Sequence, residues 1–585
     1  MHDLSIFLLC ILILIGPGLL LVLLLYSGRS WEEAIIRAPG IGLAGATYIA
    51  FCLSYLDIAL FWYAWTALAL TLAALCWRRR NSFAVFSRPD LYGTLLIILL
   101  GLVAVTRFAP TFSDILPQGW DTAFHLLLAK KILLTHRMIV DWMPFEPVSL
   151  NYPVGSHILM ADLALLTGIP LHVIFKFLVP TFGIITTAQI YWFSIRISGH
   201  RELALYASIA YAFLAILGSI NYYSWGGLPN LIGMSFFLEC LIVVTEKNFS
   251  AREICLFGLM FCAIFFTHHH VMITSGAVFA CLWVIYQFRP ADRERARMIF
   301  RGLLAAAVLG SFYMVPFLLK LPTLGGTSAL SSGETVIPLA LNFGGLGDYF
   351  TELTLLGAAL YAAQRLLNGK DRFDSLLLFT VASLAGLFVF FEYIYRAIAL
   401  LCCGKDAAAF TPSRFLTDMA GFLAILAGYS VFFLRRRLPL NTSLTVSLAS
   451  AAMLYLGWSN LWFWRGLYEQ RTSPERFQAL QWIGGNLPDN VIVLTDDAFA
   501  NYISWRRSLN TPIPISEPAS RSNWLNSREI VKQLQSGNPS EEARKWIIVS
   551  VGDPTTSTQA SDILWHSASG KESVYLQSKK PAAGG

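Results

Sequence analysis

The segment 119–125 (GWDTAFH) combines an acid and an imidazole at a spacing that suits a helix. Asp121 and His125 are four residues apart, so on a helix both side chains lie on the same face. A carboxylate beside an imidazole can accept a proton, hold a divalent cation, or do both. The local pattern alone favours another interpretation, in which Asp121 caps the helix and His125 is its polar neighbour, because Asp is a common N-cap.

Two further short segments carry side chains that suit a binding site. The segment 151–157 (NYPVGSH) contains Tyr152 and His157, although its local pattern favours an interfacial turn that begins a helix. In the segment 224–230 (SWGGLPN), paired glycines let the backbone approach a ligand closely, and Trp225 can stack on a sugar ring. An interfacial Trp beside an ordinary turn explains that segment about as well.

Three consecutive histidines, His268, His269 and His270, lie at a helix junction. Successive side chains on a helix point about 100° apart, so at most one or two of the three can bind one metal ion. A polar helix end near a substrate, with His269 as a contact, fits the pattern better than a zinc site. A divalent metal elsewhere in the site stays possible, and no cofactor is certain.

Two arginines lie where a span meets the outer loop 396–412. Arg414, in PSRFL, enters a span, and Arg396 lies at the other end of the same loop. A guanidinium there can bind a phosphate with two parallel hydrogen bonds. The usual alternative is that such an arginine extends to the lipid headgroups. Glu334, Asp348 and Glu352 are further acids, and no spacing distinguishes them.

The composition indicates what must position these residues. Of the 585 residues, 56% are hydrophobic and only 14% are charged, which is too few charges to cover a water-facing surface. The net charge of +7 is spread over short clusters between apolar runs, so nucleic acid is not an expected partner. An apolar run of about 20 residues crosses a bilayer as a helix. The sequence predicts about fourteen such spans: 4–26, 39–56, 58–76, 91–108, 171–194, 203–219, 230–245, 254–267, 271–288, 303–319, 353–367, 376–395, 413–434 and 443–460.

The basic clusters predict the orientation of the spans. They occur in alternate loops, at 78–80, 196–201, 247–252, 289–301, 370–372 and 435–437. Because cytoplasmic loops are rich in Lys and Arg, these loops are expected in the cytoplasm and both termini outside. The long loops 109–170, 320–352 and 396–412 then lie outside, and all the candidate residues fall on that one side. In the first of these loops, 121–136 and 156–167 are expected as amphipathic helices along the membrane surface.

These predictions divide the chain into three parts: N-terminal spans over 1–90, a catalytic core over 91–460, and a small soluble α/β domain over 461–585. That domain is expected to begin with a helix after Ser473, followed by strands at 491–495 and 546–551. The last dozen residues are expected to be disordered. The predicted fold is therefore an all-α polytopic membrane protein with a small C-terminal α/β extracytoplasmic domain.

Four segments resemble the GT-C glycosyltransferases, polytopic enzymes that take sugar from a polyprenyl-phosphate carrier. The segments are WDTAFHLLLAKKIL (120–133), NYPVGSHIL (151–159), PSRFL (412–416) and QALQWIGGNLPDNVIVLTDD (478–497). The resemblance implies that Asp121 is the catalytic carboxylate and that Arg414 stabilises the leaving lipid phosphate. It implies an inverting hexosyl- or pentosyltransferase in the cytoplasmic membrane. The donor would be a polyprenyl-phosphate sugar, and the acceptor a glycan, lipid or protein.

Two other functions stay open at this point. About fourteen spans is also a common size for a transporter, although transporters tend to place ionisable residues near the membrane midplane. The third possibility is a non-catalytic protein of envelope assembly that binds glycan with its C-terminal domain. Replacement of Asp121 distinguishes the enzyme from this last class.

Overall fold

The computed structural model describes most of the chain. The described residues are 2–25, 31–57, 61–78, 89–139, 141–145, 150, 152–215, 222, 226–246, 249–320, 346–368, 375–395, 401, 413–438, 441–467, 472–509, 527–536, 539–552, 560–569 and 571–577.

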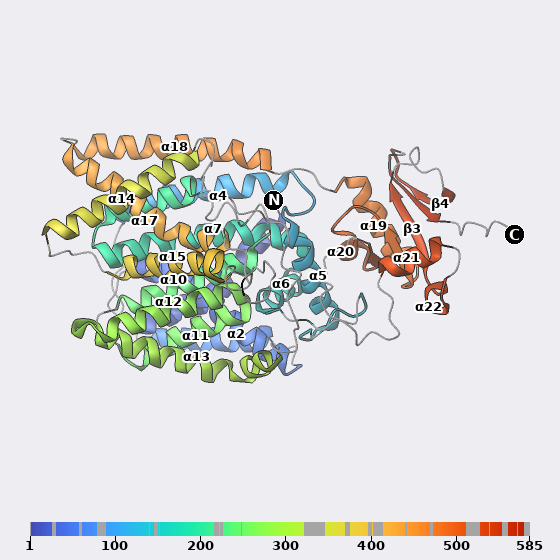
Figure 1. The fold of residues 1–585 in the computed structure, drawn as a ribbon, viewed down its shortest axis with the longest axis horizontal. Helices are drawn as coiled ribbons and strands as arrows, with labels where there is room; N and C mark the ends of the chain where they lie inside the picture. The colour runs from blue at the N-terminus through green and yellow to red at the C-terminus, as the bar shows by residue number, and fades with distance from the viewer. Residues whose placement is uncertain are drawn as a thin grey trace.

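A bundle of long helices makes up the larger part of the molecule, and a small domain with a sheet stands at one end of it (Figure 1). The helices up to residue 467 are α1 (His2–Leu25), α2 (Trp31–Tyr55), α3 (Phe61–Arg78), α4 (Leu91–Phe108), η2 (Ala109–Phe112), α5 (Trp120–Thr135), α6 (Gly155–Thr167), α7 (Leu171–Ser198), α8 (Arg201–Ile209), η3 (Ala210–Leu214), α10 (Leu228–Val244), α11 (Ala251–Thr267), α12 (His269–Gln287), η5 (Pro290–Asp292), α13 (Arg293–Lys320), α14 (Leu346–Asn368), α15 (Leu376–Val389), η7 (Phe390–Tyr395), α17 (Ser413–Arg437) and α18 (Thr442–Leu467).

Each predicted span falls on a helix of this bundle. Among the described residues, eight helices are long and apolar enough to cross a membrane: His2–Leu25, Trp31–Tyr55, Leu91–Phe112, Leu171–Ser198, His269–Gln287, Pro290–Phe317, Leu376–Tyr395 and Thr417–Arg437. The count is below the predicted one partly because α8, α10 and α11 have only 9, 17 and 17 residues. The chain is a multi-pass membrane protein.

Ion pairs join the basic-cluster loops at the end of the bundle away from the small domain. Arg201 binds Glu32 at 2.5 Å and Asp90 at 2.8 Å. Arg435 binds Glu202 at 3.0 Å. Loops that the charge pattern assigned to one side of the membrane therefore lie together. The first residues of α1 lie at the opposite end of the bundle, facing the small domain (Figure 1).

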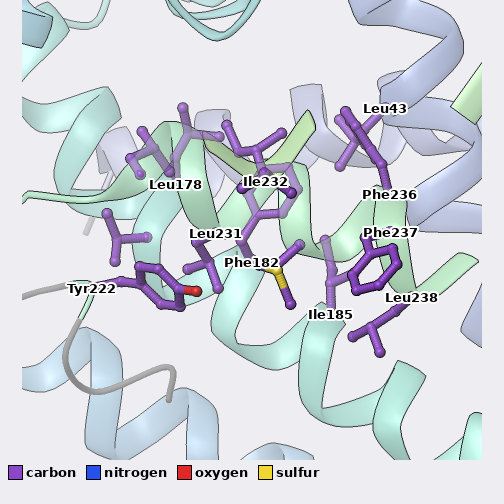
Figure 2. Close-up of a cluster of buried hydrophobic side chains, with 14 of the residues drawn as sticks. Leu43, Leu178, Phe182, Ile185, Tyr222, Leu231, Ile232, Phe236, Phe237 and Leu238 are labelled. Carbon is purple, nitrogen blue, oxygen red and sulfur yellow. The ribbon is translucent and has the colours of Figure 1, made fainter. Parts of the chain in front are cut away.

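The centre of the bundle is formed by α10, all of whose residues are buried. A helix that is apolar on every side must be covered on every side, and α10 packs against α2, α7 and α11. Figure 2 shows the apolar contact in this region, with Leu178 and Phe182 of α7 and Leu231 and Phe236 of α10. In lipid, such helices associate through close van der Waals packing, because lipid tails are as apolar as leucine.

The C-terminal domain is a five-stranded sheet with short helices. Its elements are α19 (Pro474–Asn486), β1 (Val491–Leu494), α20 (Ala500–Ser504), β2 (Arg507–Ser508), α21 (Ser527–Gln535), α22 (Glu541–Arg544), β3 (Ile547–Gly552), β4 (Ala560–His566) and β5 (Ser573–Gln577). The strand order is β2-β1-β3-β5-β4, with β1 parallel to β2 and β3 and with β5 antiparallel to its neighbours.

The start of this domain follows the sequence prediction. Ser473 caps α19 by accepting a hydrogen bond from the Arg476 amide at 3.0 Å, and the two predicted strands are β1 and β3. The prediction of disorder over the last dozen residues is wrong for 574–577, which lie in β5. Strand β5 pairs with β3 and β4 over its whole length, and those cross-strand partners are not visible in its local sequence.

The prediction that 121–136 forms an amphipathic surface helix is also wrong. That helix is α5, and four consecutive residues, 126–129, are at most 1% exposed. The C-terminal domain covers α5 on the side away from the bundle (Figure 1). Lys130 Nζ donates to the Tyr502 carbonyl at 2.5 Å, and the Tyr502 hydroxyl lies 3.0 Å from Nδ1 of His172. Burial, and secondly the charge of Arg506, lower the pKa of Lys130 to about 8.

Candidate active site

Asp121 lies in the first turn of α5. The helix begins after Gly119, which is the N-cap and makes no side-chain capping hydrogen bond. The interpretation of Asp121 as the helix cap is therefore wrong. A carboxylate in the first turn is stabilised by the partial positive charge of the helix N-terminus. Asp121 is partly exposed, whereas the next residue, Thr122, is fully buried and donates from its hydroxyl to the Gln118 carbonyl at 2.5 Å.

His125 and His157 form a buried imidazole pair. Nδ1 of His125 and Nε2 of His157 are 2.9 Å apart, and the two residues are 3% and 0% exposed. Burial lowers the pKa of His157 from 6.5 to about 3, so this ring is neutral at pH 7. A neutral imidazole has one donor and one acceptor nitrogen, and this contact uses one of the two on each ring. The pair thus fixes the orientation of His125 on α5.

Tyr152 lies between the pair of His125 (α5) and His157 (α6) and His269 of α12. Its ring centroid is 5.8 Å from that of His125, 5.7 Å from that of His157 and 5.4 Å from that of His269. The helix that follows, α6, starts at Gly155, where a Cβ atom would lie 2.7 Å from the Phe266 carbonyl. That close approach brings the segment 152–157 to the end of α11, next to the histidine run.

Two of the three consecutive histidines, His268 and His269, stack on each other with ring centroids 5.1 Å apart and both contact Tyr152, whereas His270 has a different partner. His268 is the N-cap of α12 and its Nδ1 accepts a hydrogen bond from the Val271 amide at 3.4 Å. His269 faces Tyr152, and Nε2 of His270 lies 3.2 Å from the Asp418 carboxylate. Within the described ranges there is no group of three or more His, Cys, Asp or Glu residues arranged to hold a metal ion.

The turn after Tyr222 closes the site on the opposite side. Gly226 has a φ of +89°, and a Cβ atom there would lie 2.4 Å from Oγ1 of Thr122. The sequence predicted that the two glycines let the backbone approach a ligand closely. In the structure, the backbone at Gly226 closely approaches the first turn of α5. The Tyr222 hydroxyl donates to Asp418 of α17 at 3.4 Å. The starts of α5, α12 and α17, the 152–157 segment and the turn after Tyr222 therefore surround one region.

The predicted site residues divide into three groups. His125, Tyr152, His157 and His269 come together from three parts of the sequence, and Asp121 lies one helical turn before His125 on α5. Arg414 lies in the first turn of α17, whose residue Phe415 contacts His270 with ring centroids 4.8 Å apart. Trp225 and Arg396 lie outside the described residues.

The other acids do not join this group as far as they are described. Asp348 and Glu352 lie in α14, where Glu352 is exposed, and Glu334 lies outside the described residues. The sequence reasoning missed Asp418 and its partner Tyr222. An acid inside an apolar span is a signal that could have identified Asp418, because ionisable residues in spans are rare and are kept for a function or a partner.

The accessible groups define the chemistry that this region can perform. Asp121, Phe124, Tyr152 and His269 are partly exposed, whereas His125, His157 and His270 are buried. A carboxylate can take a proton from a hydroxyl, and aromatic rings can stack on the apolar face of a sugar. The arrangement therefore suits transfer to a hydroxyl group at the end of a membrane bundle.

Solved structures of membrane proteins share this fold. The oligosaccharyltransferase of Archaeoglobus fulgidus superposes with a TM-score of 0.53 at 12% identity, over 79% of this chain and 69% of that one. ArnT of Cupriavidus metallidurans, solved with bound undecaprenyl phosphate, gives 0.52 at 11% identity, over 82% of this chain and 98% of that one.

No curated protein matches the sequence. A family model described as a family of unknown function (DUF6541) matches residues 11–390. That match covers more than half of the chain, and the superpositions cover 79% and 82% of it. The chain belongs to the DUF6541 family, and its fold is that of the GT-C glycosyltransferases.

Proposed function

We propose that this protein is a membrane glycosyltransferase that moves a sugar from a polyprenyl-phosphate carrier to an acceptor hydroxyl. The observation that carries the proposal is the position of Asp121. It is partly exposed in the first turn of α5, one turn before His125 and its cluster with Tyr152 and His157, in the fold of a protein solved with bound undecaprenyl phosphate. The acceptor is a glycan, lipid or protein.

In the proposed reaction, Asp121 removes the proton from the acceptor hydroxyl. The acceptor oxygen attacks the anomeric carbon with inversion, and the bond from that carbon to the phosphate oxygen breaks. Its electron pair leaves with the polyprenyl phosphate, whose charge Arg414 and Arg396 stabilise. Tyr152 and Trp225 contact the sugar and His269 lines the binding region. His157, expected to bind substrate, is fully buried and instead holds His125, which has a positioning role.

The charge pattern supports an outer-face location for this reaction. The ion-paired loops that contain Arg201 and Arg435 lie at the end away from the site, and such basic loops are typical of the cytoplasmic side. The site and the C-terminal domain then lie outside the cytoplasmic membrane. The carrier lipid stays in the bilayer while its phosphate reaches the starts of α5 and α17.

Donor binding tests the proposal through Arg414. Binding of labelled undecaprenyl phosphate is compared between the wild type, Arg414→Ala and Arg88→Ala, where Arg88 is a basic residue of the opposite-side loop. Loss of a charge-assisted contact weakens binding by about 10- to 100-fold. We expect that loss for Arg414→Ala and less than about a twofold change for Arg88→Ala. Equal affinities of the two variants would leave Arg414 as a headgroup anchor.

A further inference from the structure

Asp418 is a fully buried carboxylate in a helix of the bundle. It lies in the second turn of α17 and is 0% exposed, and the neighbouring residues Ala420 and Phe422 are buried as well. A charged side chain in an apolar helix bundle costs several kcal/mol unless partners compensate it. The reason for keeping an acid at this position must therefore lie in what it contacts.

Two partners from distant parts of the chain compensate the Asp418 carboxylate. Oδ2 lies 3.2 Å from Nε2 of His270, and Oδ1 accepts a hydrogen bond from the Tyr222 hydroxyl at 3.4 Å. His270 and Tyr222 are each 1% exposed, and Tyr222 is a member of the buried apolar cluster in Figure 2. Burial, and secondly the Asp418 charge, raise the pKa of Tyr222, so its hydroxyl keeps the proton that it donates.

Each partner connects Asp418 to one wall of the site. Tyr222 begins the turn that packs on Thr122 of α5, and its carbonyl accepts a hydrogen bond from the Gly227 amide at 2.9 Å. His270 lies in the first turn of α12, directly after His269, which contacts Tyr152. The three side chains therefore join the starts of α12 and α17 to the turn that abuts the helix of Asp121.

Asp418 also stands in a defined relation to Arg414. The two residues are four apart on α17, so they lie on the same face, one turn from each other. The Tyr222 hydroxyl and Nε2 of His270 contact the two oxygens of the Asp418 carboxylate from the turn before α10 and from α12.

We propose that Asp418, Tyr222 and His270 form a positioning triad that holds the first turn of α17, and with it Arg414, in place for the donor phosphate. This role rests on the proposed function, since it assumes that Arg414 binds the lipid phosphate. None of the three side chains touches the reacting atoms. The triad acts on donor affinity and leaves the chemical step to Asp121.

The test measures binding of labelled undecaprenyl phosphate by the full-length protein in detergent. Asp418→Asn keeps the shape but replaces the carboxylate oxygen that faces His270 or the one that accepts from Tyr222, and Tyr222→Phe removes a single hydroxyl. We expect affinity to fall about 10-fold or more for Asp418→Asn and about 3- to 10-fold for Tyr222→Phe. The double variant should lose less than the product of the two effects, because both changes break one network.

Ser430→Ala is the matched control on the same helix. Ser430 is buried and donates its hydroxyl to the Leu353 carbonyl at 2.5 Å, but it lies three turns beyond Asp418. It should bind undecaprenyl phosphate like the wild type. The transfer rate at saturating donor should stay within about threefold of wild type for Tyr222→Phe, since Asp121 still performs the proton transfer.

The outcomes separate the triad from the proposed function. Wild-type affinity in Asp418→Asn and Tyr222→Phe, with affinity lost in Arg414→Ala, would overturn the triad and leave the proposed function intact. Tighter binding in Asp418→Asn would also overturn it, because Asp418 would then be a competitor for Arg414. Wild-type affinity in all three variants would overturn the donor role of Arg414 itself. Melting temperatures measured in parallel identify any variant that has failed to fold, and Tyr222→Phe then decides.

Discussion

At the scale of single residues, the side chains of the candidate site have partners from distant parts of the chain. The spacing of Asp121 and His125 predicted a shared helix face, and both residues do lie at the start of α5. The partner of His125 is His157, however, 32 residues away on α6. Tyr222 and Asp418 are 196 residues apart, and no local pattern marks such a contact.

The buried His157 makes the protein sensitive to acid. Its pKa is about 3 in the folded protein and 6.5 in the exposed state, so the unfolded chain binds more protons between these values. Stability is fully present above pH 6.5 and is lost as the pH falls toward 3. At pH 5 the loss is about 2 kcal/mol. We expect the melting temperature of the wild type to fall more, from pH 7.5 to pH 5, than that of His157→Gln.

An exposed histidine of the C-terminal domain provides the control for this comparison. His566→Gln should melt with the same pH dependence as the wild type, because His566 lies on the outside of β4. An acid response in His157→Gln as large as that of the wild type would show that His157 is not the group responsible.

At the scale of elements, hydropathy located the helices of the bundle, of which eight among the described residues are long and apolar enough to span a membrane, but not the environment of the helices at the outer end. The helices α5 and α6 were expected to lie on the membrane surface with one solvated face. The structure buries α5 between the bundle and the C-terminal domain, and Lys130 reaches the carbonyl at Tyr502. Tyr502 lies 372 residues after Lys130. The sequence around α5 therefore contains no signal that the C-terminal domain buries this helix.

The contact between Gly226 and α5 gives a prediction for this element. An alanine Cβ at Gly226 would lie 2.4 Å from Oγ1 of Thr122, and the φ of +89° disfavours any side chain. We expect Gly226→Ala to lower stability by about 1–3 kcal/mol and to reduce transfer, because the first turn of α5 must shift. Thermal melting and transfer are measured together.

Gly276→Ala in α12 is the matched substitution. Its new methyl group would meet only the edge of Phe261 at 3.7 Å, and alanine favours a helix over glycine. That variant should be as stable as the wild type or slightly more stable. Equal melting temperatures for Gly226→Ala and Gly276→Ala would contradict the tight packing of the turn on α5.

At the scale of the whole molecule, the two ends of the bundle have different roles. The end away from the site is joined by ion pairs such as Arg201 with Glu32, and Arg37 inside the bundle binds Glu33 and Glu239 at 3.1 and 3.2 Å. Of these pairs, Arg37 with Glu239 joins α2 to α10, Arg201 with Glu32 joins α8 to α2, and Arg37 with Glu33 lies within α2. The other end has the partly exposed aromatic and acidic groups and the small domain.

The fold at this scale could be predicted because its signals are local. Apolar runs and Arg clusters can be recognised in short stretches of sequence. The apolar runs predicted the helices, and the Arg clusters predicted which loops lie together. Strands β4 and β5 were missed because their pairing depends on each other and on β3.

The orientation of the molecule can be tested with reporter fusions. A reporter that is active only in the cytoplasm should be silent when fused at residue 580, after the C-terminal domain, because the basic loops hold the opposite end inside. The same reporter fused after residue 438, at the end of α17 that carries Arg435, should be active. Activity at 580 with silence at 438 would invert the molecule and place the site in the cytoplasm.

The most direct test of the account is the transfer rate of Asp121→Asn. The purified protein is given an undecaprenyl-phosphate-linked sugar that the wild type turns over with an acceptor, and release of undecaprenyl phosphate is measured. Asparagine has nearly the shape of aspartate but accepts a proton far less readily, so transfer should fall by about 10²- to 10⁴-fold while donor binding and melting stay unchanged. Asp141→Asn, which alters a carboxylate paired with Lys131 at 2.6 Å, should transfer within about threefold of wild type. Transfer by Asp121→Asn at the wild-type rate would contradict the assignment of Asp121 as the base.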